Sequence, residues 1–411
     1  MNPFIVDQHI YPECFIGRKA LIKTAFNQIR NRSSLAIWGG TGMGKSSFLE
    51  LLRFPPIWEE NGLDAAQALI ILFDCQSIEP FQPNIFWRNL LEKIKKSFPA
   101  LTQELQLALS KEHNKNDDLE NLLSKLGKYN KHLVLLIDNY DVVLRSNSNY
   151  TDSDIKDFVR TFRSITHSEK TREYISIIVT SSRRLSDIAP QLTYDSSPWF
   201  NQYLFRHLKP FSEKEVNSLL DQSENLLPWE KTIRKIADGH PALLQNACYL
   251  LYEELQAENS LNISTFIREF QSATLHIFQT IWQLSTEDEQ SLLMLLALVK
   301  LKGKLGKNGY NIRGIEIVLS QKEVILNGLV ERGILKAVEE EEKTTYLFCS
   351  SIMEWWVIKK IENSQKEELT QRKKGWGNLM SRQQKQRVNQ AISWIWKNQE
   401  KIASIVEQLG D

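Results

Sequence analysis

One stretch of the sequence decides the fold: Gly39-Gly40-Thr41-Gly42-Met43-Gly44-Lys45-Ser46, which satisfies the pattern G-x-x-x-x-G-K-[ST] in full. An apolar run at 35–38 precedes it, and a helical pattern at 47–52 follows it. The glycines let successive backbone N–H groups turn inward around an anion, and the N-terminus of the helix adds the positive end of its dipole. Pattern and setting together predict a phosphate-binding loop between a buried strand and a helix.

The residue types in this loop predict how a nucleotide is held. Lys45 would reach the β- and γ-phosphates, and Ser46 would offer its hydroxyl oxygen to Mg²⁺. The expected cofactors are therefore ATP or ADP with Mg²⁺. The nucleotide-binding residues predicted in this segment are Gly39, Gly40, Thr41, Gly42, Met43, Gly44, Lys45, Ser46 and Ser47.

Around the loop, short apolar runs alternate with helical patterns. The four runs are 35–38, 69–73, 133–137 and 175–179. They are nearly continuous rather than alternating in polarity, as expected of strands buried on both faces of a sheet. Strands alternating with helices indicate a parallel sheet, so the first half of the chain is predicted to be an α/β P-loop NTPase fold.

After Pro210 the pattern becomes helical. Ser212 with Glu215, and Ser285 with Asp288, have the spacing of capping boxes, each at the start of a helix. Helices followed by two short strands about a charged turn predict a winged helix. The predicted domains are a P-loop NTPase domain with an N-terminal opening segment (1–205), an all-α lid (206–275), a winged-helix domain (276–362) and a basic C-terminal helical segment (363–411).

A metal-bound nucleotide needs a second acidic group at a neighbouring strand end. Asp138 follows the run at 133–137, and we predict that it contacts Mg²⁺ as the Walker B aspartate. The next residue is Asn139, where many ATPases have a glutamate that orients the attacking water. Because an amide cannot accept a proton, hydrolysis is expected to be slow or to use Asp141, which could equally be a capping or loop residue.

The fourth apolar run ends in a polar cluster that contains Arg183 and Arg184. Ligands bind at this edge of parallel sheets, so one arginine is predicted to contact the γ-phosphate through a charge-assisted hydrogen bond. Arg183 is the preferred candidate.

Composition excludes several classes of protein. Charged residues make up 25% and hydrophobic residues 42% of the 411 residues, which is ordinary globular composition. The longest apolar run, Leu292 to Val299, is far shorter than the roughly 20 residues of a membrane span. The four cysteines are scattered, which argues against a disulfide framework or a zinc site and favours a cytoplasmic location.

Several segments in order resemble the STAND-type NTPases and related archaeal AAA+ ATPases. They are Asn2-Pro3-Phe4, Phe15-Ile16-Gly17-Arg18, the phosphate loop, the strand ending in Asp138, Ser181-Ser182-Arg183 and Gly239-His240-Pro241. The resemblance covers about residues 2 to 360. It implies an ATP-binding switch in signalling, regulation or defence, with Gly17 and Arg18 near the base and ribose and Pro241 against the adenine; slow hydrolysis is expected from Asn139, which departs from the family's acidic pair.

The sequence departs from that family in one further respect. Many STAND proteins have a histidine near the end of the winged helix that contacts the bound diphosphate, and the matching segment here, Phe348-Cys349-Ser350-Ser351-Ile352, has none. The resemblance therefore does not imply direct nucleotide sensing by this domain.

The alternative is an AAA+-like ATPase that acts on DNA, of the origin-recognition or transposition-regulator type. Four consecutive glutamates, 339–342, argue against phosphate contacts at the predicted wing, although 300–313 carries five Lys or Arg and no acid. Residues 371–401 carry eight Lys or Arg, one acid and three tryptophans, which suits nucleic acid, an acidic membrane surface or a protein. Apolar residues at helical spacing there favour a protein partner or self-association.

Overall fold

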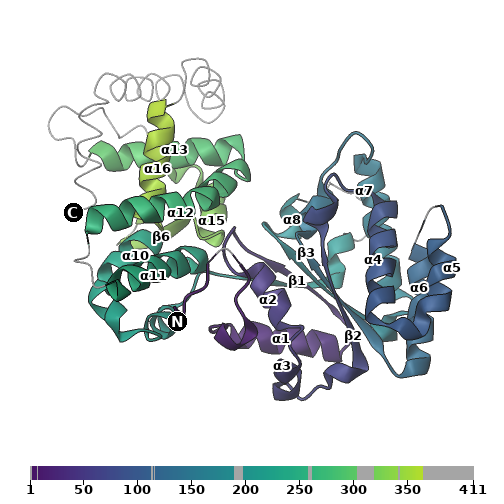
Figure 1. The fold of residues 1–411 in the computed structure, drawn as a ribbon. Helices are drawn as coiled ribbons and strands as arrows, with labels where there is room; N and C mark the ends of the chain where they lie inside the picture. Colours follow the sequence, from purple (N-terminus) through teal and green to yellow (C-terminus); the bar gives the residue numbers. More distant parts are fainter. Residues whose placement is uncertain are drawn as a thin grey trace. The chain divides into compact units, whose positions relative to one another are not determined.

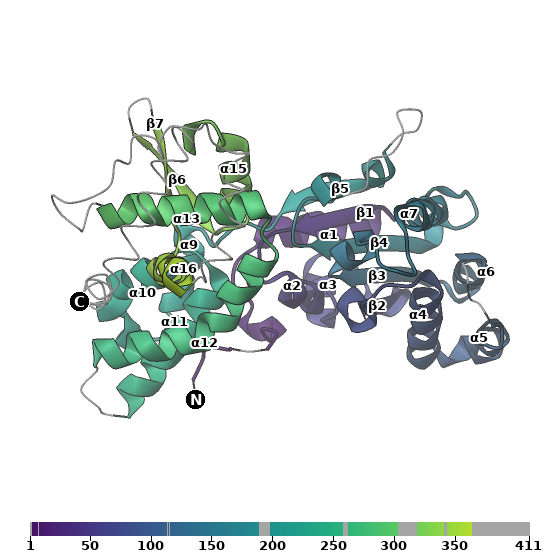
Figure 2. The same ribbon diagram turned by 90° about the horizontal axis from the view of Figure 1, so that it is seen from above.

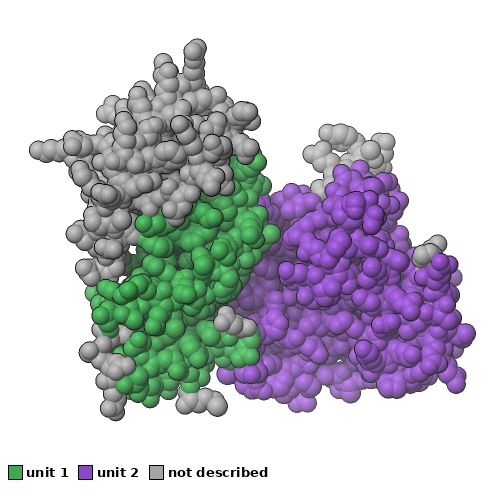
Figure 3. All heavy atoms as spheres, turned by 45° about the horizontal axis from the view of Figure 1, so that its top comes forward, with its two compact units in different colours: residues 1–8, 40–43, 209–411 green, residues 9–39, 44–208 purple. Residues whose placement is uncertain are grey.

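The computed structural model describes residues 2–6, 8–112, 114, 116–188, 198–257, 262–302, 319–340 and 343–363. The chain forms two compact units, coloured separately in Figure 3. The first, called here the sheet unit, comprises residues 9–39 and 44–208. The second, called here the helical unit, comprises residues 1–8, 40–43 and 209–411.

The sheet unit is built on a parallel sheet of five strands in the order β2-β3-β4-β1-β5. The strands are β1 (Ser34–Trp38), β2 (Ala68–Asp74), β3 (His132–Asp138), β4 (Ile175–Ser181) and β5 (Tyr203–His207). All residues of β1, β3 and β4 are buried. The four apolar runs are strands as predicted, and the α/β P-loop fold is confirmed. The expected burial on both faces is wrong for the run at 69–73, because it forms the edge strand β2, whose residues alternate between half-buried and buried.

The fifth strand, β5, is one that the sequence patterns missed. Only its first residue, Tyr203, is buried, and Arg206 is exposed. An edge strand with one neighbour, β1, has no need of a continuous apolar run, so it lacks the pattern that identified the other four.

Helices lie on both faces of the sheet (Figures 1 and 2). They are α1 (Lys19–Arg30), α2 (Lys45–Leu51), α3 (Pro55–Glu60), α4 (Pro83–Ser97), α5 (Thr102–Leu109), α6 (Asn116–Leu126), α7 (Asp152–His167) and α8 (Leu185–Ile188). Helices α1 to α3 lie on one face, and α4, α6 and α7 lie on the other. Alternate residues of β3, namely Leu133, Leu135 and Ile137, join the core beneath α4, α6 and α7, in keeping with the two-residue period of a strand.

Register brings the strand ends together at the carboxyl edge of the sheet. Asp74 at the end of β2 pairs with Asp138 at the end of β3, and Trp38 at the end of β1 pairs with Ser181 at the end of β4. Polar side chains from segments far apart in the sequence therefore meet at one edge, where ligands bind in open parallel sheets.

At the opposite end of β3, His132 is buried and should make stability depend on pH. Burial, reinforced by the positive charge of Arg32, lowers the pKa of His132 to about 4. The unfolded chain, with a pKa of about 6.5, then binds a proton more readily, so stability is lost as the pH falls from about 6.5 towards 4. At pH 5 this difference in pKa corresponds to a loss of about 2 kcal/mol in the free energy of unfolding, and screening by solvent near the strand end reduces the expected loss to about 1 kcal/mol. We expect His132→Phe to remove this loss.

The measurement is urea unfolding at pH 7 and pH 5. The difference in unfolding free energy between the two pH values should be about 1 kcal/mol smaller in His132→Phe than in the unmodified protein. His9→Phe, which changes an exposed histidine of the same unit, is the matched control. Equal pH dependence in all three proteins would contradict the prediction.

The helical unit contains residues 209–275 of the segment predicted to be the lid, and the segment predicted to be a winged helix; residues 206 and 207 instead end β5. Its helices are α9 (Glu213–Leu220), α10 (Glu230–Ala237), α11 (Pro241–Gln256), α12 (Ile263–Gln283), α13 (Glu287–Lys302), α15 (Glu323–Glu331) and α16 (Ser351–Asn363). The strands β6 (Leu335–Glu340) and β7 (Lys343–Phe348) form an antiparallel hairpin with Leu335 opposite Phe348. Helix α11 packs against α10 and α12, and α13 packs against α15 and α16. The predicted helical region and the two short strands are thus present.

Of the two predicted capping boxes, one is confirmed and one is wrong. At α9 the carboxylate of Glu215 accepts hydrogen bonds from the backbone N and the Oγ of Ser212. At α13 the box is formed one residue later than predicted. The backbone N of Thr286 donates to the Glu289 carboxylate at 2.8 Å, and the backbone N of Glu289 donates to the Thr286 hydroxyl at 3.2 Å. Ser285 instead donates a hydrogen bond from its hydroxyl to the carbonyl oxygen of Ile281, in the last turn of α12.

Some predictions lie outside the described residues: the basic C-terminal segment from 364 onward, residues 303–318, and Glu341 and Glu342 of the acidic run. Within the described part of the chain, no helix has the length and apolar character needed to cross a membrane.

Candidate functional site

The phosphate loop connects β1 to α2, as the sequence predicts. Gly42 and Gly44 have positive φ angles of 77° and 91°, a backbone conformation that side chains with a Cβ rarely adopt. Gly44 is the N-cap of α2, and Lys45 is the first residue of that helix. The local backbone thus requires glycine and ends at a helix N-terminus, which is suited to binding a phosphate.

Lys45 is held at the start of α2 with its charge directed to the loop. Its Nζ donates a hydrogen bond to the carbonyl oxygen of Gly39 at 2.8 Å. Burial holds the pKa of the Lys45 ammonium group below its usual range, and the nearby charges of Asp141 and Asp138 act in the opposite direction. A partly desolvated ammonium group gains from a further anion, such as a phosphate.

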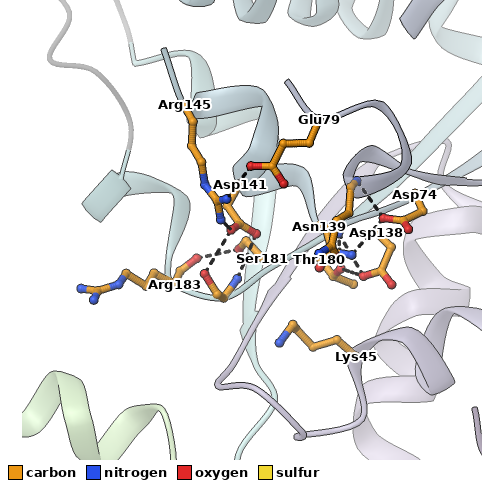
Figure 4. Close-up of polar contacts among 12 residues, drawn as sticks. Lys45, Asp74, Glu79, Asp138, Asn139, Asp141, Arg145, Thr180, Ser181 and Arg183 are labelled. Atoms are coloured by element: carbon orange, nitrogen blue, oxygen red, sulfur yellow. Dashed lines mark hydrogen bonds and ion pairs between the residues drawn. The ribbon is translucent and has the colours of Figure 1, made fainter. Parts of the chain in front are cut away.

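Asp138 is fixed by its neighbours at the carboxyl edge of the sheet. One oxygen, Oδ1, accepts hydrogen bonds from the Thr180 hydroxyl on β4 and from the backbone N of Asn139. Figure 4 shows these groups at the same sheet edge as Lys45. The partner Thr180 was not predicted, because its role depends on the pairing of β3 with β4.

The oxygens available here fit Mg²⁺. No described residue donates a hydrogen bond to Oδ2 of Asp138, and the half-buried Ser46 hydroxyl likewise has no hydrogen bond within the described chain. A carboxylate and a hydroxyl oxygen beside nucleotide phosphates are the hard ligands that Mg²⁺ prefers. Ser46 and Asp138 therefore remain the candidates to hold the ion.

Asn139 lies next to a carboxylate that the sequence patterns did not single out. Its Nδ2 donates to Oδ1 of Asp74 at 2.9 Å, and its own backbone is left-handed, with φ of 53°. Asp74 also accepts from the backbone N of Gln76 at 2.9 Å and so caps the 3₁₀ helix Cys75–Ile78. The signal that could have found Asp74 is its position directly after an apolar run, the same position that identified Asp138.

Asp141 has both carboxylate oxygens occupied. Oδ1 accepts from the backbone N of Ser182 at 3.3 Å, and Oδ2 accepts from the Ser182 hydroxyl at 3.2 Å and from Arg145 at 2.7 Å. Arg145 also pairs with Glu79 at 3.1 Å (Figure 4). This network ties the segment after β3 to the segment after β4, so these contacts favour a positioning role for Asp141.

The two arginines after β4 are in different surroundings. The guanidinium of Arg184 lies over the ring of Phe205, 5.1 Å from its centroid, which is a cation–π contact. The Arg183 side chain extends away from Lys45 and Asp138 in Figure 4, while its carbonyl accepts from the Ser181 hydroxyl. Arg183 remains the candidate for phosphate contact, and that contact would need a different orientation of its side chain.

Within the helical unit, the tip of the phosphate loop packs against two other segments. The backbone N of Ala242 donates to the Gly42 carbonyl at 3.1 Å, and a Cβ built on Gly42 would lie 2.6 Å from Cε1 of His240. A Cβ on Gly40 would lie 2.0 Å from the carbonyl oxygen of Arg332. Glycine is therefore required at 40 and 42 by close approach.

The remaining predicted contacts are located as follows. Pro241 is the first residue of α11, adjacent to the loop-tip contact just described, and Met43 is buried against Gly333. Gly17 and Arg18 both have positive φ and lead into α1. The Ser47 hydroxyl accepts a hydrogen bond from the backbone N of Ile10, so it holds the N-terminal segment. Thr41 is half-buried at the loop turn.

The family described as novel STAND NTPase 1 matches residues 8–222, more than half of the chain. The chain belongs to this family of STAND NTPases. Nucleotide binding and the P-loop architecture follow from that membership, and the resemblance stated from the sequence motifs is confirmed.

Solved structures similar to this STAND NTPase share its fold at low sequence identity. The Walker-type ATPase PABY2304 of Pyrococcus abyssi has a TM-score of 0.57 and 15% identity, over 86% of this chain and 99% of its own. The ORC2 protein of Aeropyrum pernix, in ADPNP–ADP complexes, has a TM-score of 0.50 and 15% identity, over 84% of this chain and 93% of its own. Among curated proteins, none matches this sequence.

Proposed function

We propose that this STAND NTPase binds ATP with Mg²⁺, hydrolyses it slowly, and uses the bound nucleotide as a switch in signalling, regulation or defence. The observation that carries this proposal is the arrangement at the phosphate loop: a half-buried Lys45 at the start of α2, with Asp138 and Ser46 each offering an oxygen that has no hydrogen bond in the described chain. Lysine and Mg²⁺ would stabilise the charge on the phosphates as water attacks the γ-phosphorus.

The switching part of the proposal rests on the loop tip. Residues 40–43 contact the start of α11 and the Arg332–Gly333 turn that precedes β6. A phosphate bound by this loop would orient the same backbone groups, so the packing of α11 and of that turn should respond to the nucleotide. Contacts with a protein partner or with a second copy of the chain would then change with nucleotide state.

A role on DNA, the alternative from the sequence, is less well supported. Helix α15, which would be the reading helix of a winged-helix domain, contains no Lys or Arg between Glu323 and Glu331. Because DNA affinity rests largely on neutralising phosphates, a helix with acidic residues at both ends is poorly suited to the major groove. We therefore favour protein partners.

Calorimetry with ATP and ADP tests the proposal. We expect binding of both nucleotides, and we expect Ser46→Ala to weaken ATP binding about 10-fold when Mg²⁺ is present, because a metal ligand is lost. With EDTA in place of Mg²⁺, the same substitution should change affinity less than about two-fold. No binding by the unmodified protein would overturn the function, and equal weakening in both conditions would overturn the metal assignment.

Hydrogen exchange tests the switch separately. The amide of Ala242 donates to the loop carbonyl of Gly42, so its exchange rate reports the contact between the loop tip and α11. Protection of this amide should differ between the ADP-bound protein and the protein bound to a non-hydrolysable ATP analogue. Equal protection, with both nucleotides bound, would reject the switch and leave nucleotide binding standing.

A further inference from the structure

The carboxylate of Asp74 lies beside the Walker B strand end although it belongs to another strand. Parallel pairing sets Asp74 of β2 in register with Asp138 of β3. Asp74 is exposed, whereas Asp138 is buried. Both acidic groups therefore end their strands at the same edge of the sheet, one embedded among neighbours and the other open to solvent.

Hydrogen bonds fix the orientation of the Asp74 carboxylate. Its Oδ1 accepts from the backbone N of Gln76 and from Nδ2 of Asn139, both at 2.9 Å. Its Oδ2 accepts no hydrogen bond from the described residues. One oxygen is thus anchored from two directions, and the other is held in place with its lone pairs available to water.

Most carboxylate oxygens of the neighbouring acids already accept hydrogen bonds. Asp141 uses both oxygens on Ser182 and Arg145, and Asp138 uses Oδ1 on Thr180 and Asn139, with Oδ2 assigned to Mg²⁺. Burial raises the pKa of the Cys75 thiol, and the charges of Asp74, Asp141 and Asp138 raise it further, as expected if all three carboxylates share one region. Asp74 is the carboxylate that accepts a hydrogen bond from the side chain of Asn139, whereas Asp138 accepts from its backbone N.

We propose that Asp74 is the catalytic carboxylate that orients the attacking water, and that Asn139 is a positioning residue that holds it. This inference rests on the proposed ATP hydrolysis. Asn139 stands where an acidic residue that orients the attacking water would be expected. Its side-chain amide donates a hydrogen bond to Asp74, whose carboxylate can orient that water instead. Phosphoryl transfer depends mainly on positioning and electrostatics, so a carboxylate supplied by the adjacent strand can serve.

The reaction step is a direct displacement by water. The water donates a hydrogen bond from one O–H to Oδ2 of Asp74, and its oxygen forms a bond to the γ-phosphorus while the bond from that phosphorus to the β,γ-bridging oxygen breaks. ADP leaves with the electron pair of the broken bond. The proton of the water departs along its hydrogen bond to Asp74 and is released to solvent, so the products are ADP, inorganic phosphate and a proton.

Asp74→Asn isolates this role because the amide oxygen can still accept from Gln76 and Asn139. We expect kcat for ATP hydrolysis to fall about 100-fold while the Kd for ATP changes less than about two-fold. The matched control is Asp64→Asn: Asp64 is also exposed and also caps a 3₁₀ helix, accepting from the backbone N of Ala66 at 2.8 Å, but it precedes β2 rather than following it. Its kcat should be unchanged.

A double variant, Asp74→Asn with Asn139→Asp, exchanges the two groups and keeps their summed charge. Position 139 has a left-handed backbone, which aspartate tolerates as asparagine does. We expect this exchange to recover at least about 10-fold of the activity lost in Asp74→Asn, because a carboxylate is returned to the pair. A purely structural role for Asp74 would give no such recovery.

Each outcome decides the inference. Unchanged kcat in Asp74→Asn, equal losses in kcat and ATP affinity, or an exchange variant no faster than Asp74→Asn would overturn it. If the unmodified protein binds ATP without turning it over, this inference fails and nucleotide binding stands. Absence of ATP binding would instead remove the proposed function itself.

Discussion

Lys45→Ala should weaken ATP binding at least about 100-fold, which corresponds to about 3 kcal/mol for a lost charge-assisted contact with phosphate. Nζ of Lys45 already lies 2.8 Å from the carbonyl oxygen of Gly39, at the edge of the loop. A bound phosphate would replace or add to this partner. Titration calorimetry with ATP and Mg²⁺ measures the change directly.

The fold should survive this substitution. Burial lowers the pKa of Lys45, which means that the folded state disfavours its charge, so removing the ammonium group relieves an unfavourable term. The melting temperature of Lys45→Ala without nucleotide should therefore be no lower than that of the unmodified protein. Lys19→Ala, at the exposed first position of α1, is the control and should keep its ATP affinity. An affinity for ATP within about three-fold of normal in Lys45→Ala would contradict the assignment of Lys45.

Phe86→Ala should lower the free energy of unfolding of the sheet unit by about 3–5 kcal/mol, because it leaves a cavity among packed rings. Phe86 is fully buried, with ring centroids of its neighbours at 4.8 Å (Phe73), 5.9 Å (Phe81), 5.0 Å (Trp87), 5.4 Å (Phe158) and 6.0 Å (Phe162). Urea unfolding followed by tryptophan fluorescence measures the loss.

The control for this core substitution is Leu107→Ala on α5. The Leu107 residue is 72% exposed, so its truncation should cost less than about 0.5 kcal/mol. Similar losses for the two variants would show that the aromatic cluster does not carry the stability of this unit. Phe73 directly precedes Asp74, so loss of Phe86 should also loosen the strand end that presents that carboxylate.

Much of the fold could be predicted because its decisive elements have local signals. Strands β1 to β4 are continuous apolar runs, and the loop carries a pattern that its own backbone angles require, with positive φ at Gly42 and Gly44. The strand β5 lacked such a signal because an edge strand need not be apolar throughout. The start of α13 was misplaced by one residue because Ser285 and Thr286 are both capable caps, and only the tertiary packing decides between them.

The candidate site likewise contains residues that local sequence signals identify and contacts that depend on long-range strand pairing. Lys45, Ser46 and Asp138 could be predicted from motifs close in sequence, whereas the contacts of Asp138 with Thr180 and of Asn139 with Asp74 join residues 42 and 65 positions apart, respectively. Register between such strands is set by the whole sheet, and no short pattern encodes it. For the same reason the contact of Gly42 with His240 and Ala242 could not be read from the motifs.

The path of the chain has a practical consequence for dissecting this protein. Because residues 1–8 and 40–43 belong with the helical unit, the polypeptide passes from one unit to the other at 8/9, 39/40, 43/44 and 208/209. No single cut can separate the two units into intact halves. A truncated polypeptide that ends at residue 208 would retain the entire G-x-x-x-x-G-K-[ST] segment but would lose His240, Ala242 and Arg332 from around its tip. Excising the α/β half would therefore not isolate the loop as it exists in the whole protein.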